Sequence, residues 1–345
     1  MQNPLRFSVV INSYNRRDYV CEAVESVLQQ TYAAHEIIVI VDGSSDDSVD
    51  VLQKRYPHES FPQVQIVDQV NSGVAMTRNT GIALATGNWM AFLDDDDLWH
   101  REKLQITADH IAQRPECGAI NNAYWVFATS AEESGEEAFE ADFIARDLQE
   151  CHKAVENGDP SRKDFSFMQI EGKSFRLLLE AMRGSLSSSV VRRDILIRAG
   201  GFAPMQGCTD DWTMAINVAR ICEWHTIPRR LVFIRTHGQQ ATHNIYNSVN
   251  LLSVLVHAWH SGRPFPAATD RKTTRRRLAS YGHVYRRYVQ IGFWGAVRLR
   301  EYWAARLIFL LGLSLLPRSR DILYILTPPQ VTWRVENKRL LKEKK

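Results

Sequence analysis

Four consecutive aspartates are the residues of this chain with the clearest chemical potential. Asp94-Asp95-Asp96-Asp97 follows the apolar run Met90–Leu93 and precedes Leu98-Trp99. Neighbouring carboxylates at the end of a buried strand repel one another unless a cation or solvent compensates their charge. A divalent ion needs only one or two carboxylates together with phosphate oxygens. We therefore expect Asp96 to contact a metal ion and Asp94 to orient water or a bound ligand. A solvated loop or a helix cap is the alternative.

A second acidic pair and one histidine are further candidates. Asp210-Asp211 precedes Trp212 and follows the glycine-rich stretch from Gly200 to Gly207. Acidic residues also simply favour the start of a helix, where they complement its dipole. His237 comes shortly after an apolar run, and an imidazole is an acceptable ligand for Mn²⁺, although a surface histidine is equally consistent with the pattern.

Alternating apolar runs and helical repeats must position these residues. We expect strands at 7–11, 37–41, 64–67, 90–93, 187–191 and 231–234. Helical spacing predicts helices over 18–30, 46–56, 76–85, 193–199 and 212–221. Strands that alternate with helices indicate an α/β fold with a doubly wound, mostly parallel sheet, whose functional residues lie at the carboxyl ends of its strands.

Composition limits the class of protein. The 345 residues are 45% hydrophobic and 23% charged, which excludes disordered and collagen-like chains. The first seven residues lack the apolar core of a secretory signal. The five cysteines are scattered without paired metal-ligand spacing, which suits small apolar side chains in a reducing cytosol.

Charge and composition also suggest how the chain is divided. Residues 271–345 carry 18 Lys and Arg against 4 Asp and Glu, a balance of +14, which leaves 24 basic and 35 acidic residues, or −11, for the rest. The acidic, irregular stretch 131–170 is interpreted as a surface insertion, either part of an acceptor-binding mouth or a variable solvated loop. We expect a catalytic domain over 1–245, with halves at 1–100 and 101–245, and a basic, aromatic helical region over 246–345.

Several motifs in a fixed order resemble those of the family 2 glycosyltransferases. They are Val9-Val10-Ile11-Asn12-Ser13-Tyr14-Asn15, Val39-Ile40-Val41-Asp42-Gly43-Ser44-Ser45-Asp46, Asn71-Ser72-Gly73 with Arg78-Asn79, the four aspartates, Ser187-Ser188-Ser189, Gly200-Gly201-Phe202 and Asp210-Asp211-Trp212. The resemblance covers roughly residues 5 to 240. It implies the GT-A fold, a nucleotide-diphosphate sugar as donor, Mn²⁺ or Mg²⁺ as cofactor, and inversion at the anomeric carbon.

The resemblance also implies roles for individual residues on the donor side. Asn12 and Tyr14 are expected to line the base pocket, and Asp42 to accept a hydrogen bond from the nucleobase. Gly73 lets the backbone approach the nucleoside, and Arg78 supports the pocket or the pyrophosphate. The family often has two acids before the Gly-Ser of the second motif, whereas the first position here is Val41. This departure weakens any inference about which base is bound.

The resemblance assigns the remaining candidates to the reaction centre. Asp94 and Asp95 are expected to contact the donor, Asp96 and His237 to bind the metal ion, and Asp211 to act as the general base, with Asp210 where the family usually has Glu. The expected reaction moves a sugar, with a UDP-sugar as the expected donor, to a hydroxyl of a glycan or a lipid-linked acceptor. The alternative is a catalytically silent nucleotide-sugar-binding or scaffold protein at a membrane.

The C-terminal region has its own expected partner. Its arginines alternate with Tyr, Trp and Phe, which is typical of helices that lie on an anionic membrane surface. Leu307–Leu316 is too short to predict a membrane span. The chain shows no module typical of nucleic-acid binding. We expect a cytoplasmic protein, peripheral on the inner face of the cell membrane. A helical hairpin packed on the catalytic domain is the alternative.

Overall fold

The computed structural model describes residues 4–128, 170–180, 182, 184–204, 210–236, 249, 252–253, 282–298, 300–315, 322 and 325–327. It divides into two compact units. The first comprises Met1–Pro204 and Met214–Gln240, and the second comprises Met205–Thr213 and Ala241–Lys345. The expected boundary after residue 245 stays a prediction.

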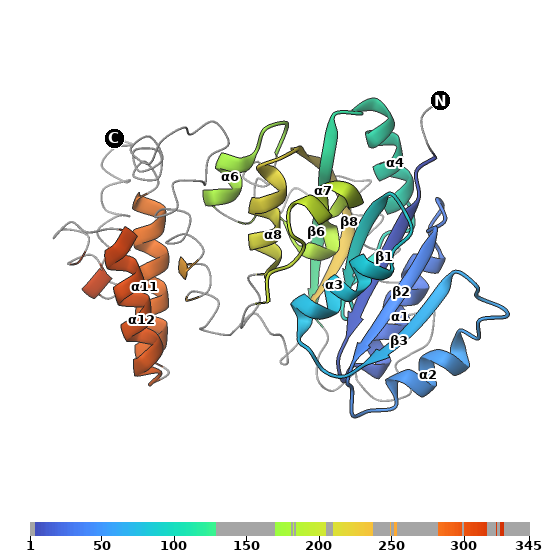
Figure 1. Ribbon diagram of the computed structural model, residues 1–345, viewed down its shortest axis with the longest axis horizontal. Helices are drawn as coiled ribbons and strands as arrows, with labels where there is room; N and C mark the ends of the chain where they lie inside the picture. Colours follow the sequence, from blue (N-terminus) through green and yellow to red (C-terminus); the bar gives the residue numbers. More distant parts are fainter. Residues whose placement is uncertain are drawn as a thin grey trace. The chain divides into compact units, whose positions relative to one another are not determined.

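A single mixed sheet is the centre of the first unit (Figure 1). Its strand order is β3-β2-β1-β4-β7-β6-β8-β5. The strands are β1 (Phe7–Ser13), β2 (Glu36–Asp42), β3 (Val64–Gln69), β4 (Trp89–Asp94), β5 (Leu98–Trp99), β6 (Cys117–Ala128), β7 (Val190–Arg192) and β8 (Glu223–Thr236). The four strands β3, β2, β1 and β4 are parallel. Their carboxyl ends therefore meet at one edge, as the sequence predicted.

The other half of the sheet contains both strand directions. Strand β7 is antiparallel to β4 and to β6, β8 is parallel to β6, and β5 is antiparallel to β8. The expected α/β fold with a mostly parallel sheet is confirmed, and the antiparallel pairs are an addition that apolar periodicity does not reveal. Strands β6 and β4 run in the same direction, because β7 is antiparallel to both.

Some expected boundaries were wrong. The strand expected at 187–191 is a 3₁₀ helix, η2 (Leu186–Ser188), followed by the short β7. The Oγ atoms of Ser188 and Ser189 both donate to the Ser185 carbonyl, and these bonds stabilise the local turn. The strand expected at 231–234 is the last part of the longer β8.

Helices cover both faces of the sheet. They are α1 (Arg17–Leu28), α2 (Ser48–Arg55), α3 (Val74–Leu84), α4 (Lys103–Gln113), α6 (Phe175–Glu180), α7 (Arg193–Arg198) and α8 (Asp210–Ala219). On β1, Val9 and Ile11 belong to the same buried cluster as Val20 and Val24 of α1. Val10 points to the opposite face, where it lies so close to Gly81 of α3 that a Cβ there would be 2.5 Å from its Cγ1.

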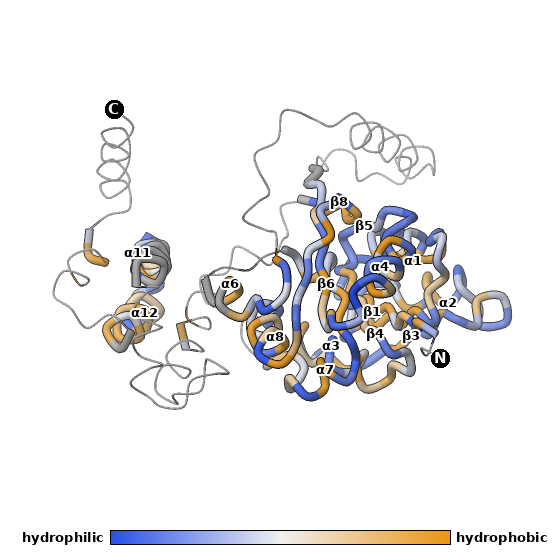
Figure 2. The backbone as a smooth tube through the Cα atoms, turned by 90° about the horizontal axis from the view of Figure 1, so that it is seen from above, coloured by the Kyte–Doolittle hydropathy of each residue, from blue (hydrophilic) through white to orange (hydrophobic). Residues whose placement is uncertain are grey.

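Hydrophobic burial explains this two-sided arrangement. Residues 37–41 of β2 are all buried, which is the pattern of a strand covered on both faces. Apolar segments gather along the strands in Figure 2, whereas hydrophilic segments run through many of the outer turns. Each large apolar side chain buried in this way contributes about 1.5–3 kcal/mol to folding. The resulting rigid sheet fixes the positions of the loops at its edge.

Two helices form the main described part of the second unit. They are α11 (Gly282–Arg298) and α12 (Tyr302–Leu315), and they lie side by side in both views (Figures 1 and 2). Gly312 of α12 permits their close approach, because a Cβ there would be 2.5 Å from Val289. Among the described residues, no helix is both long and apolar enough to cross a membrane.

Candidate functional site

The carboxyl ends of three parallel strands bring the first group of candidate residues together. The register places Asn12 of β1 beside Ile40 of β2 on one side and Asp94 of β4 on the other. The Oδ1 atom of Asn12 is buried and has no hydrogen-bond partner among the residues that the structure describes. A buried amide oxygen without a partner is unfavourable, so this atom favours a bound donor group at the sheet edge.

Asp42 ends β2 and holds the loop that follows β3. Its Oδ1 accepts hydrogen bonds from Gln69 Nε2 (2.7 Å) and Ser72 N (2.9 Å), and its Oδ2 accepts one from Gly73 N (2.9 Å). Burial would raise the pKa of Asp42, but the bonds from Gln69 and the two backbone N–H groups outweigh it and hold that pKa below its usual value. Asp42 is therefore an ionised acceptor at the rim of the site.

Two glycines give this rim its shape. Gly43 has a φ of +67°, and a Cβ there would lie 2.6 Å from the backbone nitrogen of Asn71, so only glycine fits. Gly73 has a φ of +85° and precedes α3, with open space where a Cβ would stand. The backbone at Gly73 is thus exposed at the amino end of a helix, which is a favourable position for an anion.

The acidic loop turns sharply at the end of β4. Asp97 N donates to the Asp94 carbonyl oxygen (3.1 Å), so the four residues form a turn and do not continue the alternation of a strand. Asp94 points to Arg78 of α3, whose guanidinium donates to its Oδ1 (2.8 Å). The guanidinium of Arg78 also lies 5.5 Å from the centre of the Phe202 ring. Arg78 thus supports the wall of the site.

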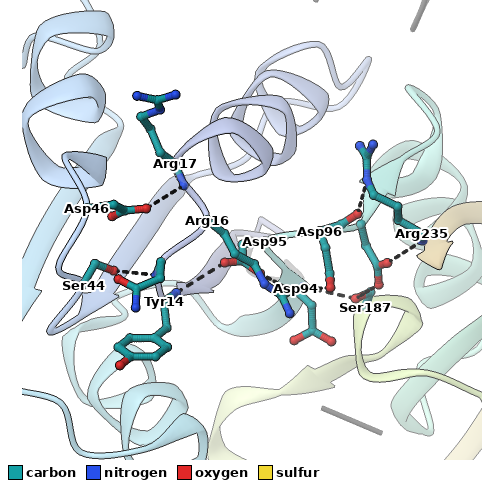
Figure 3. Close-up of polar contacts among 12 residues, drawn as sticks. Tyr14, Arg16, Arg17, Ser44, Asp46, Asp94, Asp95, Asp96, Ser187 and Arg235 are labelled. Atoms are coloured by element: carbon teal, nitrogen blue, oxygen red, sulfur yellow. Dashed lines mark hydrogen bonds and ion pairs between the residues drawn. The ribbon is translucent and has the colours of Figure 1, made fainter. Parts of the chain in front are cut away.

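Arg16 lies between the next two aspartates (Figure 3). A single nitrogen, Nη1, donates to Asp95 Oδ1 (3.0 Å) and also to Asp96 Oδ2. Two carboxylate oxygens therefore converge on one cationic atom. Tyr14, whose side chain is exposed, contributes its backbone N–H to Asp95 Oδ2 (3.4 Å).

Asp97 is bound from two sides and fixes the loop to the sheet. Ser187 Oγ donates to its Oδ2 (2.6 Å), and Arg235 N donates to its Oδ1 (3.1 Å). The Ser187 hydroxyl also accepts a hydrogen bond from Asp94 N (3.1 Å), so one serine joins both ends of the turn. Asp97 is a structural member of the loop.

The Arg235 side chain lies beneath the loop and is buried. It donates through Nε to the Asp96 carbonyl oxygen (2.9 Å), pairs with Glu22 of α1, and stacks over Tyr19 with 4.5 Å to the ring centre. The guanidinium of Arg235 is thus paired inside the protein.

Burial perturbs the carboxyl groups of the loop. Desolvation raises the pKa of Asp95, the positive charge of Arg16 lowers it, and the negative charge of Asp96 raises it. The net result is a pKa of about 7. Desolvation, together with the charges of Asp96 and Asp94, holds the pKa of Asp97 well above its usual range. Burial first, and neighbouring negative charge second, thus raise the pKa of both carboxyl groups, which is typical of functional sites.

The remaining sequence candidates lie elsewhere in the chain. Asp210 and Asp211 begin α8 and belong to the second unit, and Asp211 Oδ1 accepts a hydrogen bond from Trp212 N (2.6 Å). Their expected position beside the acidic loop stays a prediction. His237 and the insertion at 131–169 lie outside the described residues.

Sequence reasoning missed three residues that organise the acidic loop. Arg16, Ser187 and Glu22 were given no role in it. Ser187 lies within a serine triplet that was noted as a motif, but its pairing with Asp97 spans 90 residues of chain. Arg16 follows the Asn12–Asn15 motif directly, so a cation next to that motif was the available signal.

Part of the chain is similar to known glycosyltransferases. The family model described as Glycosyl transferase family 2 matches residues 8–163. A glycosyltransferase of Escherichia coli strain K12, YibD, is 42% identical over 132 residues, which are 38% of each protein. TuaG of Bacillus subtilis, named as a putative teichuronic acid biosynthesis glycosyltransferase, is 37% identical over 107 residues. These residues are 31% of this chain and 42% of TuaG. The matches thus span less than half the length of these relatives.

Solved structures show the same fold at low sequence identity. Residues 1–349 of S. aureus TarS, in complex with UDP-GlcNAc, superpose with a TM-score of 0.59 at 14% identity, over 93% of this chain and 89% of that one. The mannosyltransferase PcManGT of Pyrobaculum calidifontis, in complex with GDP-Man and Mn²⁺, gives 0.55 at 17% identity, over 93% and 85%.

Proposed function

This chain belongs to glycosyl transferase family 2 through its residues 8–163, and on this premise we propose that it is an inverting glycosyltransferase. The donor is a nucleotide-diphosphate sugar, which we take to be a UDP-sugar. The acceptor is a hydroxyl of a glycan or of a lipid-linked saccharide. The observation that carries the proposal is the convergence of the Asp42–Gly73 rim and the acidic loop at one edge of the parallel strands.

The rim suits the nucleoside part of the donor. Asp42 is ionised, and its Oδ2 has acceptor capacity beyond the Gly73 bond, because a carboxylate oxygen accepts about two hydrogen bonds. A nucleobase N–H can donate to it. The exposed ring of Tyr14 offers a stacking surface. Asn12 Oδ1, which has no hydrogen-bond partner in the described part of the chain, offers a further acceptor. The solved structures with this fold hold UDP-GlcNAc or GDP-Man, which agrees with this class of ligand.

The acidic loop suits a divalent ion next to the diphosphate. Asp95 and Asp96 each direct one oxygen at the Nη1 atom of Arg16, so these two carboxylates already bind a positive charge between them. Oxygen ligands are those that Mg²⁺ and Mn²⁺ prefer. When bound, such an ion compensates the charge of the departing diphosphate. Asp96 is its proposed ligand, with His237 as a second ligand, while Asp94 and Asp95 orient the donor.

The protein's own residues supply the proton transfer. We assign the general base to Asp211, with Asp210 beside it. Asp211 takes the proton of the acceptor hydroxyl as that oxygen bonds to the anomeric carbon. The bond from the anomeric carbon to the diphosphate breaks on the opposite face, so the configuration inverts. Arg78 keeps Asp94 in place during this exchange through its 2.8 Å contact.

The competing proposal is a catalytically silent protein that binds nucleotide sugars or acts as a scaffold. The two proposals differ in turnover, since a binder releases no nucleoside diphosphate. The test incubates the full chain with UDP- and GDP-sugars, with Mn²⁺, Mg²⁺ or EDTA, and measures released nucleoside diphosphate. We expect metal-dependent release that increases with a suitable acceptor. Tight nucleotide-sugar binding without release from any donor would favour the binder.

A cytoplasmic location at the inner face of the cell membrane is part of the proposal. On α12, Tyr302, Trp303 and Leu310 are 62%, 73% and 61% exposed. Arg298, Arg300 and Arg306 are exposed in the same helical pair. Exposed aromatic and basic side chains together favour an anionic lipid surface as a partner.

A further inference from the structure

A second group of ligand-type side chains lies away from the acidic loop. It consists of His110 near the end of α4, Cys117 at the start of β6 and His225 near the start of β8. Their ligand atoms all lie within 4.8 Å of one another. Because β6 and β8 run in the same direction as β4, their first residues lie at the edge of the sheet opposite to Asp94–Asp97.

The two imidazoles of this group are unsatisfied. The Nε2 atoms of His110 and of His225 are both buried without a hydrogen-bond partner among the described residues. His225 is 4% exposed and Cys117 is 1% exposed, so neither reaches bulk water. The two rings meet edge to face with their centres 5.5 Å apart. Two buried ring nitrogens without a hydrogen-bond partner are unfavourable unless something binds them.

A carboxylate lies next to one member of this group. Glu223 Oε2 lies 3.6 Å from His225 Nε2. Glu116, Glu223 and His225 also have ligand atoms within 4.8 Å of one another. His225 is therefore shared by two groups of ligand atoms, one with His110 and Cys117 and one with the carboxylates of Glu116 and Glu223.

From this geometry we propose that His110, Cys117, His225 and Glu223 form a structural zinc site. Zn²⁺ is bound in tetrahedral sites by histidine nitrogen, cysteine sulfur and carboxylate oxygen, whose atoms are then roughly 3.3–3.8 Å apart. The ligand atoms of His110, Cys117 and His225 already lie within 4.8 Å of one another, and Glu223, next to His225, is the proposed fourth ligand. Two neutral imidazoles, one thiolate and one carboxylate carry a charge of −2, so the loaded site is neutral and suited to burial. The Cys117 proton is released to solvent on binding.

The site differs from the acidic loop in its chemistry and in its role. Nitrogen and sulfur ligands favour Zn²⁺, whereas carboxylate oxygens favour Mg²⁺ or Mn²⁺. The ion joins the end of α4 to the first residues of β6 and β8, which are neighbours in the sheet. An ion that binds only the folded chain stabilises it. We therefore expect zinc to stabilise this half of the sheet without any part in sugar transfer.

Cobalt substitution tests the site, because a thiolate gives Co²⁺ a charge-transfer absorption that oxygen ligands cannot give. The metal-free full chain is titrated with Co²⁺. We expect one equivalent to produce this absorption together with the intense visible bands of a four-coordinate ion, and one equivalent of Zn²⁺ to remove both. The variant Cys117→Ser should lose the charge-transfer absorption. Cys222→Ser is the matched control and should keep it, since Cys222 belongs to neither group of potential ligands among the described residues.

A second variant and a stability readout protect the test from misfolding. His110→Gln changes a half-buried ligand and should weaken Co²⁺ binding at least tenfold. Zn²⁺ should raise the Tm of the wild type and of Asp96→Ala equally, which separates this site from the acidic loop and from the proposed activity. Absence of the charge-transfer band in the wild type, or its survival in Cys117→Ser, would overturn the proposal.

Discussion

Arg16 balances the negative charge of the acidic loop at the level of single residues. Its Nη1 contacts both Asp95 and Asp96, and its side chain is 19% exposed. A divalent ion that uses these oxygens must displace the guanidinium, and a diphosphate attracts the displaced guanidinium. We therefore expect the ion and the donor to bind more tightly together than either binds alone.

Asp96→Ala tests the metal ligand. The change removes one of the two carboxylates that converge on Arg16. Transfer should fall by about 10²–10³-fold or more, the usual size for loss of a charge-stabilising group, and Mn²⁺-dependent binding of nucleoside diphosphate should be lost. Initial rates and calorimetric titration measure the two effects. Asp109→Ala, an exposed aspartate on α4, is the control. Full activity of Asp96→Ala in EDTA would refute the assignment.

Asp211→Asn tests the general base. The amide keeps the size of the side chain but cannot take a proton, so kcat should fall by about 10²–10⁴-fold while donor affinity changes little. Steady-state rates and donor titration separate these quantities. Asp210→Asn is the paired variant. If that change abolishes transfer while Asp211→Asn remains near wild type, the two roles are reversed.

At the level of elements, η2 and the last residues of β8 hold the acidic loop. Ser187 of η2 bonds both Asp94 and Asp97, and Arg235 of β8 bonds Asp96 and Asp97. The indole of Trp99 adds a hydrogen bond to the Ser187 carbonyl (2.9 Å). The turn is thus positioned by two elements distant in sequence.

Ser187→Ala tests this support. It leaves the buried Asp97 without one of its donors, so the free energy of unfolding should fall by about 1–3 kcal/mol and kcat should fall with it. Urea unfolding and initial rates measure the two effects. Ser189→Ala is matched in burial, but its hydroxyl bonds the Ser185 carbonyl. Equal kcat losses in both variants would contradict a specific role for Ser187.

Lys103, the first residue of α4, lowers the free energy of unfolding by an amount that depends on pH. Its amine is buried 4.5 Å from the centre of the Trp99 ring and has no hydrogen-bond partner in the described part of the chain. Burial lowers the pKa of Lys103 to about 7. Between pH 7 and about 10.5 the unfolded chain binds more protons at this lysine than the folded chain, so the lysine makes stability rise with pH in that window.

Lys103→Met should remove this dependence. At pH 7 and below, the variant should be more stable than the wild type by about 1–3 kcal/mol, because a buried charge no longer has to be formed or neutralised. The advantage should shrink as pH rises towards 10.5. Urea unfolding across that range measures it, with the exposed Lys54→Met as control. A difference independent of pH would show that Lys103 does not titrate in this way.

At the scale of the whole molecule, charge is unevenly distributed along the chain. The last 75 residues carry +14 and the rest −11. Helix α12 is more hydrophobic than α11 in Figure 2, and it exposes two large hydrophobic side chains, Trp303 and Leu310. A basic and aromatic surface of this kind gains about 1 kcal/mol for each Lys or Arg near an anionic leaflet.

Vesicle flotation tests this surface. The full chain should bind anionic vesicles more strongly than neutral ones, and salt should weaken the binding because exposed charges are screened over about 8–10 Å. Trp303→Ala should weaken the vesicle binding that persists at high salt. Ile197→Ala, which changes an exposed residue of α7, should leave that binding unchanged. Equal binding to both vesicle types would refute the electrostatic contribution. Binding to neither would favour a hairpin that packs on protein.

The sequence by itself determined the features that depend on neighbouring residues. Apolar runs predicted β1, β2, β3 and β4, because a strand covered on both faces must be apolar throughout. Motifs at the ends of those runs predicted the family and placed Asp42 and Asp94 at one sheet edge. Elements with mixed patterns, such as α4 and β6, were missed because their burial depends on what packs against them.

Only the tertiary structure decided how buried charges and polar atoms are paired. Arg16 joins Asp95 and Asp96 across about 80 residues, Ser187 joins Asp97 across 90, and Arg235 reaches Glu22 across 213. The spacing of the cysteines showed no metal site, yet Cys117 lies beside His110 and His225. Such contacts arise when strands far apart in the chain become neighbours, and no local pattern records which residues will then meet.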